Sequence, residues 1–203
     1  MIIVIIRHGE TPQNLRGVFQ GQSDPDLDDV GKERFKEIGR LLKDEQWDAI
    51  YSSNYKRSVA SADFLTADVQ VPRFISTEFT ERHLGVLDGG VKASLLAADP
   101  DLSEKLMTLD YAPFKGELGS LALARFVRGI RTVATEHFGR VVIVSHGGIV
   151  ALFAHFVLGL PRTSCFLEHG HALVLSISGS EMSLVGMNLP PDALVFNLRD
   201  YGS

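Results

Sequence analysis

Two short segments of this 203-residue chain place a histidine beside glycine directly after an apolar run. The first is Arg7-His8-Gly9, and the second is His146-Gly147-Gly148. A neutral imidazole is a nucleophile, glycine lets a ligand approach the backbone closely, and a helix that begins at such a turn favours an anion. Arginine is a bidentate partner for an oxyanion such as phosphate. Together the two segments predict phosphate chemistry at one shared site.

Each of these residues also has an ordinary structural interpretation. A lone histidine at the end of a strand is more often a hydrogen-bonded structural residue than a catalyst, and Arg57 could be an exposed helix cation. The pairing of His8 and His146 with glycine at two similar positions, and of His8 with an arginine, favours a functional role for both. Arg57 follows Ser52 and Ser53 by about one helical turn, which places it near the same rim.

The elements that must position these residues follow from the hydrophobic pattern. Continuous apolar runs alternate with segments of helical period, which is typical of an α/β domain whose sheet is covered on both faces. In such sheets, ligands bind just beyond the carboxyl ends of the strands, where both histidines fall. We expect a mostly parallel sheet with an antiparallel edge hairpin, built from Ile2–Ile6, Asp48–Ser52, Arg73–Ile75, Val141–Ser145, Ala172–Ile177 and Met182–Gly186.

Four helices are expected between these strands. Their apolar positions are Phe35, Ile38, Leu41 and Leu42 in the first, which Asp28 or Asp29 caps; Val59, Ala62 and Leu65 in the second; Leu123, Phe126, Val127, Ile130, Val133 and Ala134 in the third, which closes at Gly139; and the apolar run after Gly148 in the fourth.

Composition narrows the class of protein. A hydrophobic content of 45% over 203 residues can bury the core of one domain, and we expect a single domain over residues 1–203. The net charge of −5 gives no basic excess for nucleic acid or an anionic membrane, so neither is expected as a partner. The single cysteine, Cys165, suits a reducing compartment, and the cytoplasm is the expected location. Monomer and homodimer both stay open.

Five segments, in order along most of the chain, carry a resemblance to a known family. They are "RHGET" with Asn14 following, "SSNYKR", "TERHLGVLDGG", "GELGSLALAR" and "VSHGG". The chain resembles the histidine phosphatase (phosphoglycerate mutase-like) superfamily. That resemblance implies a three-layer α/β/α fold, a small phosphorylated substrate, and transfer of the phosphoryl group through a phosphohistidine, without a cofactor or a metal.

The resemblance also implies a role for each matching residue. His8 would be the nucleophile, Glu81 would protonate the leaving oxygen and then activate water, and three side chains would hold the phosphoryl oxygens, namely Arg7, Arg57 and His146. Further substrate-binding positions are Asn14, Gln20, Gly21, Arg82 and Gly147. An imidazole attacks only when neutral, and neighbouring arginines disfavour its protonation.

We expect a phosphohydrolase, with two alternatives. Arg82, His83 and Lys92 resemble the mutase branch, which keeps a 2,3-bisphosphoglycerate-dependent phosphoglycerate mutase open, although that branch carries a tyrosine where this chain has Leu84. A phosphate-binding regulatory protein without turnover is the third. His169 and His171 could in principle hold a metal from one strand face, but they lack a nearby partner motif. The stretch from Val91 to Lys115 has no recognisable motif, so the substrate stays undefined.

Overall fold

A computed structural model of the chain describes residues 1–137 and 139–194. Six strands form one sheet in the order β3-β2-β4-β1-β5-β6. The neighbours from β3 to β1 are parallel, whereas β5 is antiparallel to both β1 and β6. The strands are β1 (Ile2–Arg7), β2 (Ala49–Ser52), β3 (Arg73–Ile75), β4 (Arg140–Ser145), β5 (Ala172–Ser178) and β6 (Glu181–Leu189).

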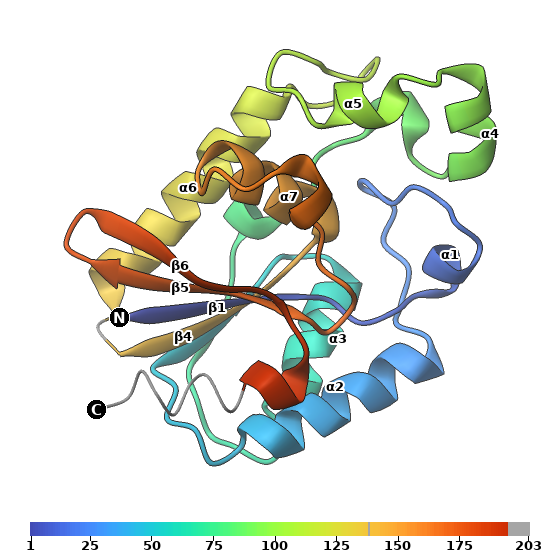
Figure 1. Ribbon diagram of the computed structural model, residues 1–203. Helices are drawn as coiled ribbons and strands as arrows, with labels where there is room; N and C mark the ends of the chain where they lie inside the picture. The colour runs from blue at the N-terminus through green and yellow to red at the C-terminus, as the bar shows by residue number, and fades with distance from the viewer. Residues whose placement is uncertain (138, 195–203) are drawn as a thin grey trace.

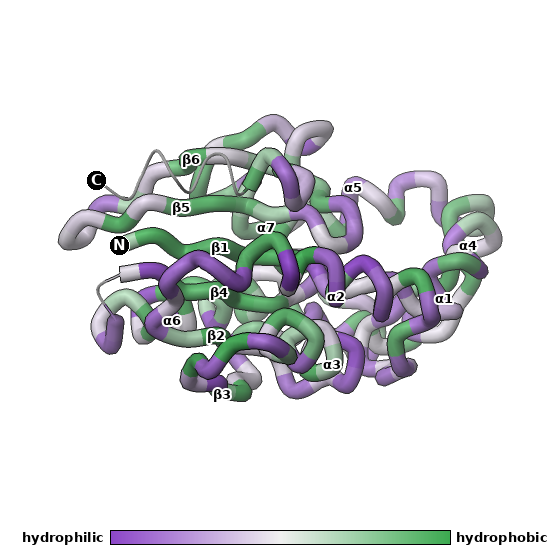
Figure 2. The backbone as a smooth tube through the Cα atoms, turned by 90° about the horizontal axis from the view of Figure 1, so that it is seen from below, coloured by the Kyte–Doolittle hydropathy of each residue, from purple (hydrophilic) through white to green (hydrophobic). Residues whose placement is uncertain are grey.

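Helices cover both faces of this sheet (Figure 1). One face packs against α2 (Asp29–Leu42) and α3 (Lys56–Leu65), where Phe35 and Ile38 meet the inward side chains of β1 and β4. The other face packs against α6 (Gly119–Glu136) and α7 (Gly147–Phe156). Figure 2 shows the central strands as hydrophobic and α2 with hydrophilic stretches along its length. The three-layer arrangement and the antiparallel edge hairpin are as predicted from the sequence.

The predicted strands are confirmed to within a few residues, and the helices differ in detail. Asp28, and not Asp29, caps α2, because its carboxylate accepts the Gly31 N–H at 2.7 Å. Leu41 lies outside the buried stripe of α2 and is 39% exposed. The third predicted helix ends at Glu136, short of Gly139, because His137 is already extended.

The stretch that sequence patterns left unplaced forms a small cover over one end of the sheet. It contains α4 (Lys92–Ala98) and α5 (Leu102–Leu106), and short 3₁₀ turns precede it at η1 (Thr77–Phe79) and η2 (Gly85–Leu87). This cover is joined to the loop after α1 (Pro12–Leu15) by an antiparallel bridge between Val18 and Val91. The remaining short element is η3 (Arg162–Ser164).

No helix in the part of the chain that the structure describes is both long and apolar enough to cross a bilayer. The most hydrophobic helix, α7, is ten residues long and is buried against α6. Its apolar sequence is therefore explained by its place in the core.

Candidate active site

The register of two parallel strands brings the two predicted histidines together. Arg7 at the end of β1 pairs with Ser145 at the end of β4, and the His8 N–H donates to the Ser145 carbonyl at 3.0 Å. His8 and His146 are the next residues on their strands, and their ring centroids lie 5.0 Å apart. The expectation that both strand ends build one site is therefore met by the geometry.

His8 is held in the form that can act as a nucleophile. Its ring is buried, and its Nδ1 lies 2.7 Å from the Gly9 carbonyl, which can only accept a hydrogen bond. Nδ1 must therefore carry the proton, and the lone pair is on Nε2. Burial, together with the charges of Arg57 and Arg7, holds the pKa of His8 well below its usual value, so the ring is neutral near pH 7.

Arg57 directs its guanidinium at this lone pair from the first turn of α3. Its Nε donates to His8 Nε2 at 3.2 Å, and the side chain is fully buried. Two carbonyls hold the other nitrogens, Ser23 O at 2.7 Å from Nη1 and Gly21 O at 3.4 Å from Nη2. Gly21 thus acts through its backbone, and a Cβ at this position would come within 2.8 Å of the Leu84 nitrogen.

Two buried polar atoms beside His8 have no hydrogen-bond partner among the described residues, Arg7 Nε and His146 Nδ1. Each belongs to a side chain that is otherwise fixed. Arg7 Nη1 donates to the Leu167 carbonyl at 2.7 Å, and His146 Nε2 lies 2.7 Å from the Ser53 hydroxyl. Leaving such atoms unpaired costs about 1–3 kcal/mol each, so their geometry favours an oxyanion as the missing partner.

Glu81 sits at the N-terminus of α7. Its carboxylate accepts the backbone N–H groups of Gly148 and Ile149, each at 2.8 Å, and the Arg82 N–H at 2.9 Å. A helix N-terminus favours a negative charge, which explains why a carboxylate can be buried there. A Cβ on Gly148 would lie 2.8 Å from Glu81 Oε1, so the glycine makes room for this contact.

The remaining predicted positions lie around the same site, but some of their polar atoms are already hydrogen-bonded within the protein. Asn14 Oδ1 accepts from the Thr11 N–H at 3.1 Å, and Gln20 Nε2 donates to the Thr11 hydroxyl at 2.9 Å, so both amides brace the loop around α1. Gly147 packs on Arg7, since a Cβ there would lie 3.1 Å from the guanidinium carbon. A side chain at Gly147 would therefore press on the Arg7 guanidinium.

Arg82 lies beside the site, but its guanidinium donates hydrogen bonds to backbone carbonyls of the protein. Nε donates to the Glu117 carbonyl at 3.0 Å and Nη1 to the Leu106 carbonyl at 2.8 Å. Nη2 donates to the Tyr111 carbonyl. With each nitrogen donating to a carbonyl, this side chain anchors the cover that follows it, and its substrate-binding role stays a prediction.

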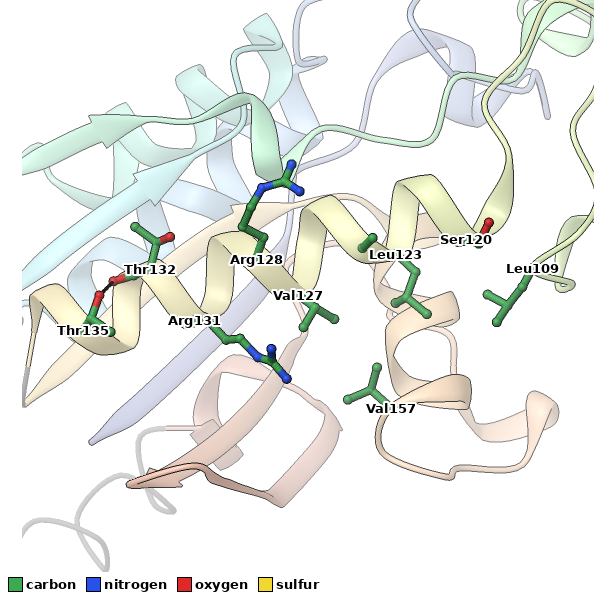
Figure 3. A pocket seen from close by; sticks show the side chains of 10 residues that line it. Leu109, Ser120, Leu123, Val127, Arg128, Arg131, Thr132, Thr135 and Val157 are labelled. Carbon is green, nitrogen blue, oxygen red and sulfur yellow. Dashed lines mark hydrogen bonds between the residues drawn. The ribbon is translucent and has the colours of Figure 1, made fainter.

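A cavity of about 300 Å³ opens onto these side chains. Arg7, His8, Glu81 and the Gly147-Gly148 turn line its inner end. A wider groove of about 690 Å³ runs along the outer side of α6, as Figure 3 shows, but none of the predicted site residues lines it. The chemistry therefore belongs to the smaller cavity.

Two residues near the site were not predicted as part of it. The His169 ring lies 5.3 Å from the His8 ring, and its Nδ1 is 2.9 Å from the His8 carbonyl. His171 instead turns its Nδ1 to the Asn188 carbonyl at 3.1 Å, so the two histidines do not converge, and both precede β5. No group of three or more potential metal ligands occurs in the described ranges.

Asp88 is the second such residue. Its carboxylate accepts the N–H groups of Gly21, Gln22 and Ser23 at 2.9, 3.0 and 2.7 Å and the Ser23 hydroxyl at 2.8 Å. It therefore fixes the loop whose carbonyls orient Arg57. The only sequence signal was its place, seven residues after Glu81.

Comparison with known proteins also points to phosphate chemistry, since the chain is similar to several phosphatases. A metal-independent phosphoserine phosphatase of Arabidopsis thaliana is 32% identical over 154 residues, which cover 73% of this chain and 65% of that protein, so the chain spans about two thirds of this relative. A glucosyl-3-phosphoglycerate phosphatase of Mycolicibacterium vanbaalenii is 32% identical over 170 residues, covering 78% of this chain and 75% of that protein.

A solved structure of a mycobacterial glucosyl-3-phosphoglycerate phosphatase with VO3 superimposes with a TM-score of 0.84 at 25% identity, covering 93% of this chain and 98% of the other. This likeness confirms the predicted phosphoglycerate mutase-like fold. Residues 3–189 match the family described as the histidine phosphatase superfamily, branch 1. Since that match spans nearly all of the described chain, the protein belongs to the histidine phosphatase superfamily.

Proposed function

We propose that the protein is a phosphohydrolase that acts on a small phosphorylated metabolite through a phosphohistidine at His8. The observation that carries this proposal is the pair of buried, unpartnered atoms, Arg7 Nε and His146 Nδ1, beside a neutral imidazole whose Nε2 is unprotonated. A phosphoryl group on His8 would give both atoms the oxygen acceptors that they lack. The phosphatase names of the relatives agree with this chemistry.

The first half of the reaction transfers the phosphoryl group to the enzyme. His8 Nε2 donates its lone pair to phosphorus while the bond from phosphorus to the leaving oxygen breaks. Arg7, Arg57 and His146 offset the charge on the equatorial oxygens. In this scheme the Glu81 carboxylate, which lines the same cavity, receives the proton that the phosphate monoanion brings and gives it to the leaving alkoxide, so that the alcohol departs neutral.

The second half returns the enzyme to its starting state. Water attacks the phosphorus of phosphohistidine, and Glu81 takes the proton that the water loses. The bond from phosphorus to Nε2 breaks, which restores the lone pair of His8, and the released inorganic phosphate takes the proton from Glu81. Hydrolysis is favoured over a mutase reaction because Arg82, which would have to hold a second anionic group, already donates to three backbone carbonyls.

Mass spectrometry of a quenched turnover mixture tests the mechanism. The expected result is an acid-labile, alkali-stable phosphate on His8 and loss of turnover in His8→Ala, with activity unchanged in His155→Ala, a histidine at the far end of α7. Phosphate on another residue would refute the assignment. Efficient, primer-dependent interconversion of 3- and 2-phosphoglycerate that exceeds phosphate release would establish the mutase instead.

The same proposal covers the partners and the location. We expect neither a metal nor a cofactor, so a chelator should leave the rate unchanged, and inactivation with rescue by zinc would contradict this. The buried thiol of Cys165 is compatible with a reducing cytoplasm, which cell fractionation checks. Monomer and homodimer stay as alternatives, which sedimentation analysis distinguishes.

A further inference from the structure

The cavity has two chemically different ends. Its inner end carries the charged groups already described. Lys92 lies between the two ends, since its ammonium is 5.4 Å from the centre of the Phe19 ring, which belongs to the outer end, and also interacts electrostatically with Arg7 and Glu81. The outer end of the cavity must accommodate whatever the phosphate is attached to. The chemistry of that end therefore selects the substrate's alcohol.

Apolar side chains dominate the outer end. They come from five separate parts of the chain: the loop after α1, the turn at η2, the α4 and α5 cover, the middle of α7, and the segment after η3. The residues are Val18, Phe19, Leu84, Leu96, Leu106, Met107, Leu152 and Phe166. Such a wall favours binding of a hydrocarbon group, because the binding free energy improves in proportion to the apolar area removed from water.

Polar groups at the outer end are few, and most are engaged. Asn14 and Gln20 are bonded to Thr11, and Arg82 is bonded to the carbonyls of the cover. Among the described residues that line the cavity, the uncharged polar groups without a hydrogen bond to the protein are the Ser103 hydroxyl on α5 and the NH2 group of Asn14, whose Oδ1 alone is bonded to Thr11. A leaving group with several hydroxyls would have to give up hydrogen bonds to water there without replacement.

The outer wall is formed in advance of binding. The Phe19 N–H donates to the Gly90 carbonyl, and the Gly89 N–H donates to the Phe19 carbonyl, both at 2.9 Å. The Lys92 N–H donates to the Gly17 carbonyl at 2.8 Å, and its ammonium lies 5.4 Å from the centre of the Phe19 ring. A wall tied on both sides can favour one shape of ligand without first having to order itself.

We propose that this active site takes phosphate monoesters of small apolar alcohols in preference to phosphates of sugars and other polyhydroxylated or zwitterionic alcohols. The inference rests on the proposed phosphohydrolase function and adds the substrate class to it. The cavity volume of about 300 Å³ limits the alcohol to a small one. The lining residues, and not the phosphate-binding groups, make this selection.

Hexyl phosphate and glucose 6-phosphate form a matched pair for the test, since both are six-carbon esters of a primary alcohol. The expected kcat/KM is about tenfold or more higher for hexyl phosphate, because the apolar body gains burial and the sugar loses hydrogen bonds. O-phosphoserine, a small zwitterionic ester, should rank with the sugar. Equal or better use of glucose 6-phosphate or O-phosphoserine would overturn the inference.

Two variants test whether the apolar residues of the outer end produce this preference. Leu96→Asn, which keeps the branching of the side chain and its number of heavy atoms, should reduce the ratio of the two kcat/KM values by about threefold or more, mainly through KM for hexyl phosphate. Phe166→Ala is the second variant, because this ring is 57% exposed and its truncation leaves the core intact. Leu121→Asn is the control, since Leu121 is 62% exposed on α6 outside the cavity and should leave the ratio unchanged.

The outcomes separate this inference from the function on which it rests. Hydrolysis that depends on His8 but favours the sugar phosphate removes the apolar preference and leaves the phosphohydrolase intact. No hydrolysis of any ester, together with no phosphate on His8, removes both. An unchanged ratio in both Leu96→Asn and Phe166→Ala would show that the wall does not select the substrate.

Discussion

The two ends of the cavity are built in different ways. The inner end stands on β1, β4 and α3, and its residues His8, Arg57 and His146 are almost completely buried. The outer end stands on loops and on the short helices α4 and α5, neither of which has more than one buried residue. A rigid sheet thus positions the groups proposed to bind phosphate, while short segments with few buried residues, tied together by backbone hydrogen bonds, form the wall that meets the alcohol.

This difference separates the effects of substitution. A change at the inner end should lower turnover for every substrate, because the same groups act on the phosphoryl oxygens of each. A change at the outer end should alter KM for one class of alcohol and leave phosphoryl transfer from other esters unchanged. Each prediction below either tests that separation or measures how rigid the inner end is.

The largest effect is expected from Glu81→Gln. An amide cannot give a proton to an alkoxide, so kcat for an alkyl phosphate should fall by about 10²- to 10⁴-fold. An aryl phosphate, whose leaving group needs no proton, should lose much less in the phosphoryl-transfer step, which the burst of aryl alcohol measures. Equal losses for both esters would remove Glu81 from the acid role. Glu104→Gln on the exposed side of α5 is the matched control.

A smaller loss is expected from Arg57→Lys. Lysine keeps the charge but cannot bond His8 Nε2 and the Ser23 carbonyl together, as Arg57 does at 3.2 and 2.7 Å. Losing a charge-assisted hydrogen bond costs about 1.5–3 kcal/mol, so kcat/KM should fall about tenfold to hundredfold for all substrates alike. Steady-state kinetics with hexyl phosphate and glucose 6-phosphate checks this. A loss confined to one ester would contradict the separation of the two ends.

A still smaller loss of activity is expected from Asp88→Ala, because this substitution acts indirectly, through the loop that holds Arg57. Four donors lose their acceptor, and the Gly21 and Ser23 carbonyls lose their fixed place. We expect kcat to fall by about tenfold with a smaller change in KM, since the loop positions a charge-assisted hydrogen bond rather than the alcohol.

Asp88→Asn separates this positioning effect from general loss of structure. Its amide oxygen can accept two of the four hydrogen bonds, whereas its NH2 group faces the two remaining donors, so it should recover only part of the kcat that Asp88→Ala loses. An Asp88→Asn variant no better than Asp88→Ala, with both fully folded by circular dichroism, would show that both carboxylate oxygens are needed. Unchanged kcat in both variants would remove Asp88 from the positioning role.

The inner end could be predicted from the sequence, and the outer end could not. Local signals specify the inner end: an apolar run predicts a buried strand, and parallel strand ends must meet, which places His8 beside His146. The outer end depends on contacts between distant segments, such as the bridge of Val18 to Val91, that no local pattern encodes. The hydrogen bonds from Arg82 to backbone carbonyls could not be predicted for the same reason, since all three acceptors lie at least 24 residues away from Arg82 in the sequence.

His169 shows the same limit at the inner end itself. In the sequence it looks like half of a metal-binding pair, and only the fold brings its ring against His8 while His171 turns away. The strand β5 had been predicted, but not the loop geometry that directs the two side chains apart. Residue types and spacing thus indicated the histidine that we propose as the nucleophile, but not all of its neighbours.

The smallest expected effect is on the pH dependence of protein stability, and it arises from His169. Burial and the charge of Arg7 lower the pKa of His169 to about 4 in the folded protein, whereas the unfolded chain binds a proton near pH 6.5. Below pH 6.5 the unfolded state therefore holds more protons, so stability falls as the pH falls and is independent of this group above pH 6.5. The buried rings of His8 and His146 act in the same direction.

We therefore expect the free energy of unfolding of the wild type to decline between pH 7 and pH 5.5, before most carboxylates titrate. His169→Gln removes one of the contributing groups, so its decline over this range should be about 1 kcal/mol smaller. Urea unfolding at both pH values measures the difference, with His155→Gln as the control for a histidine outside the site. An identical decline in the wild type and His169→Gln would mean that His169 titrates alike in the folded and unfolded states, and that the inner end is more open to water than its packing indicates.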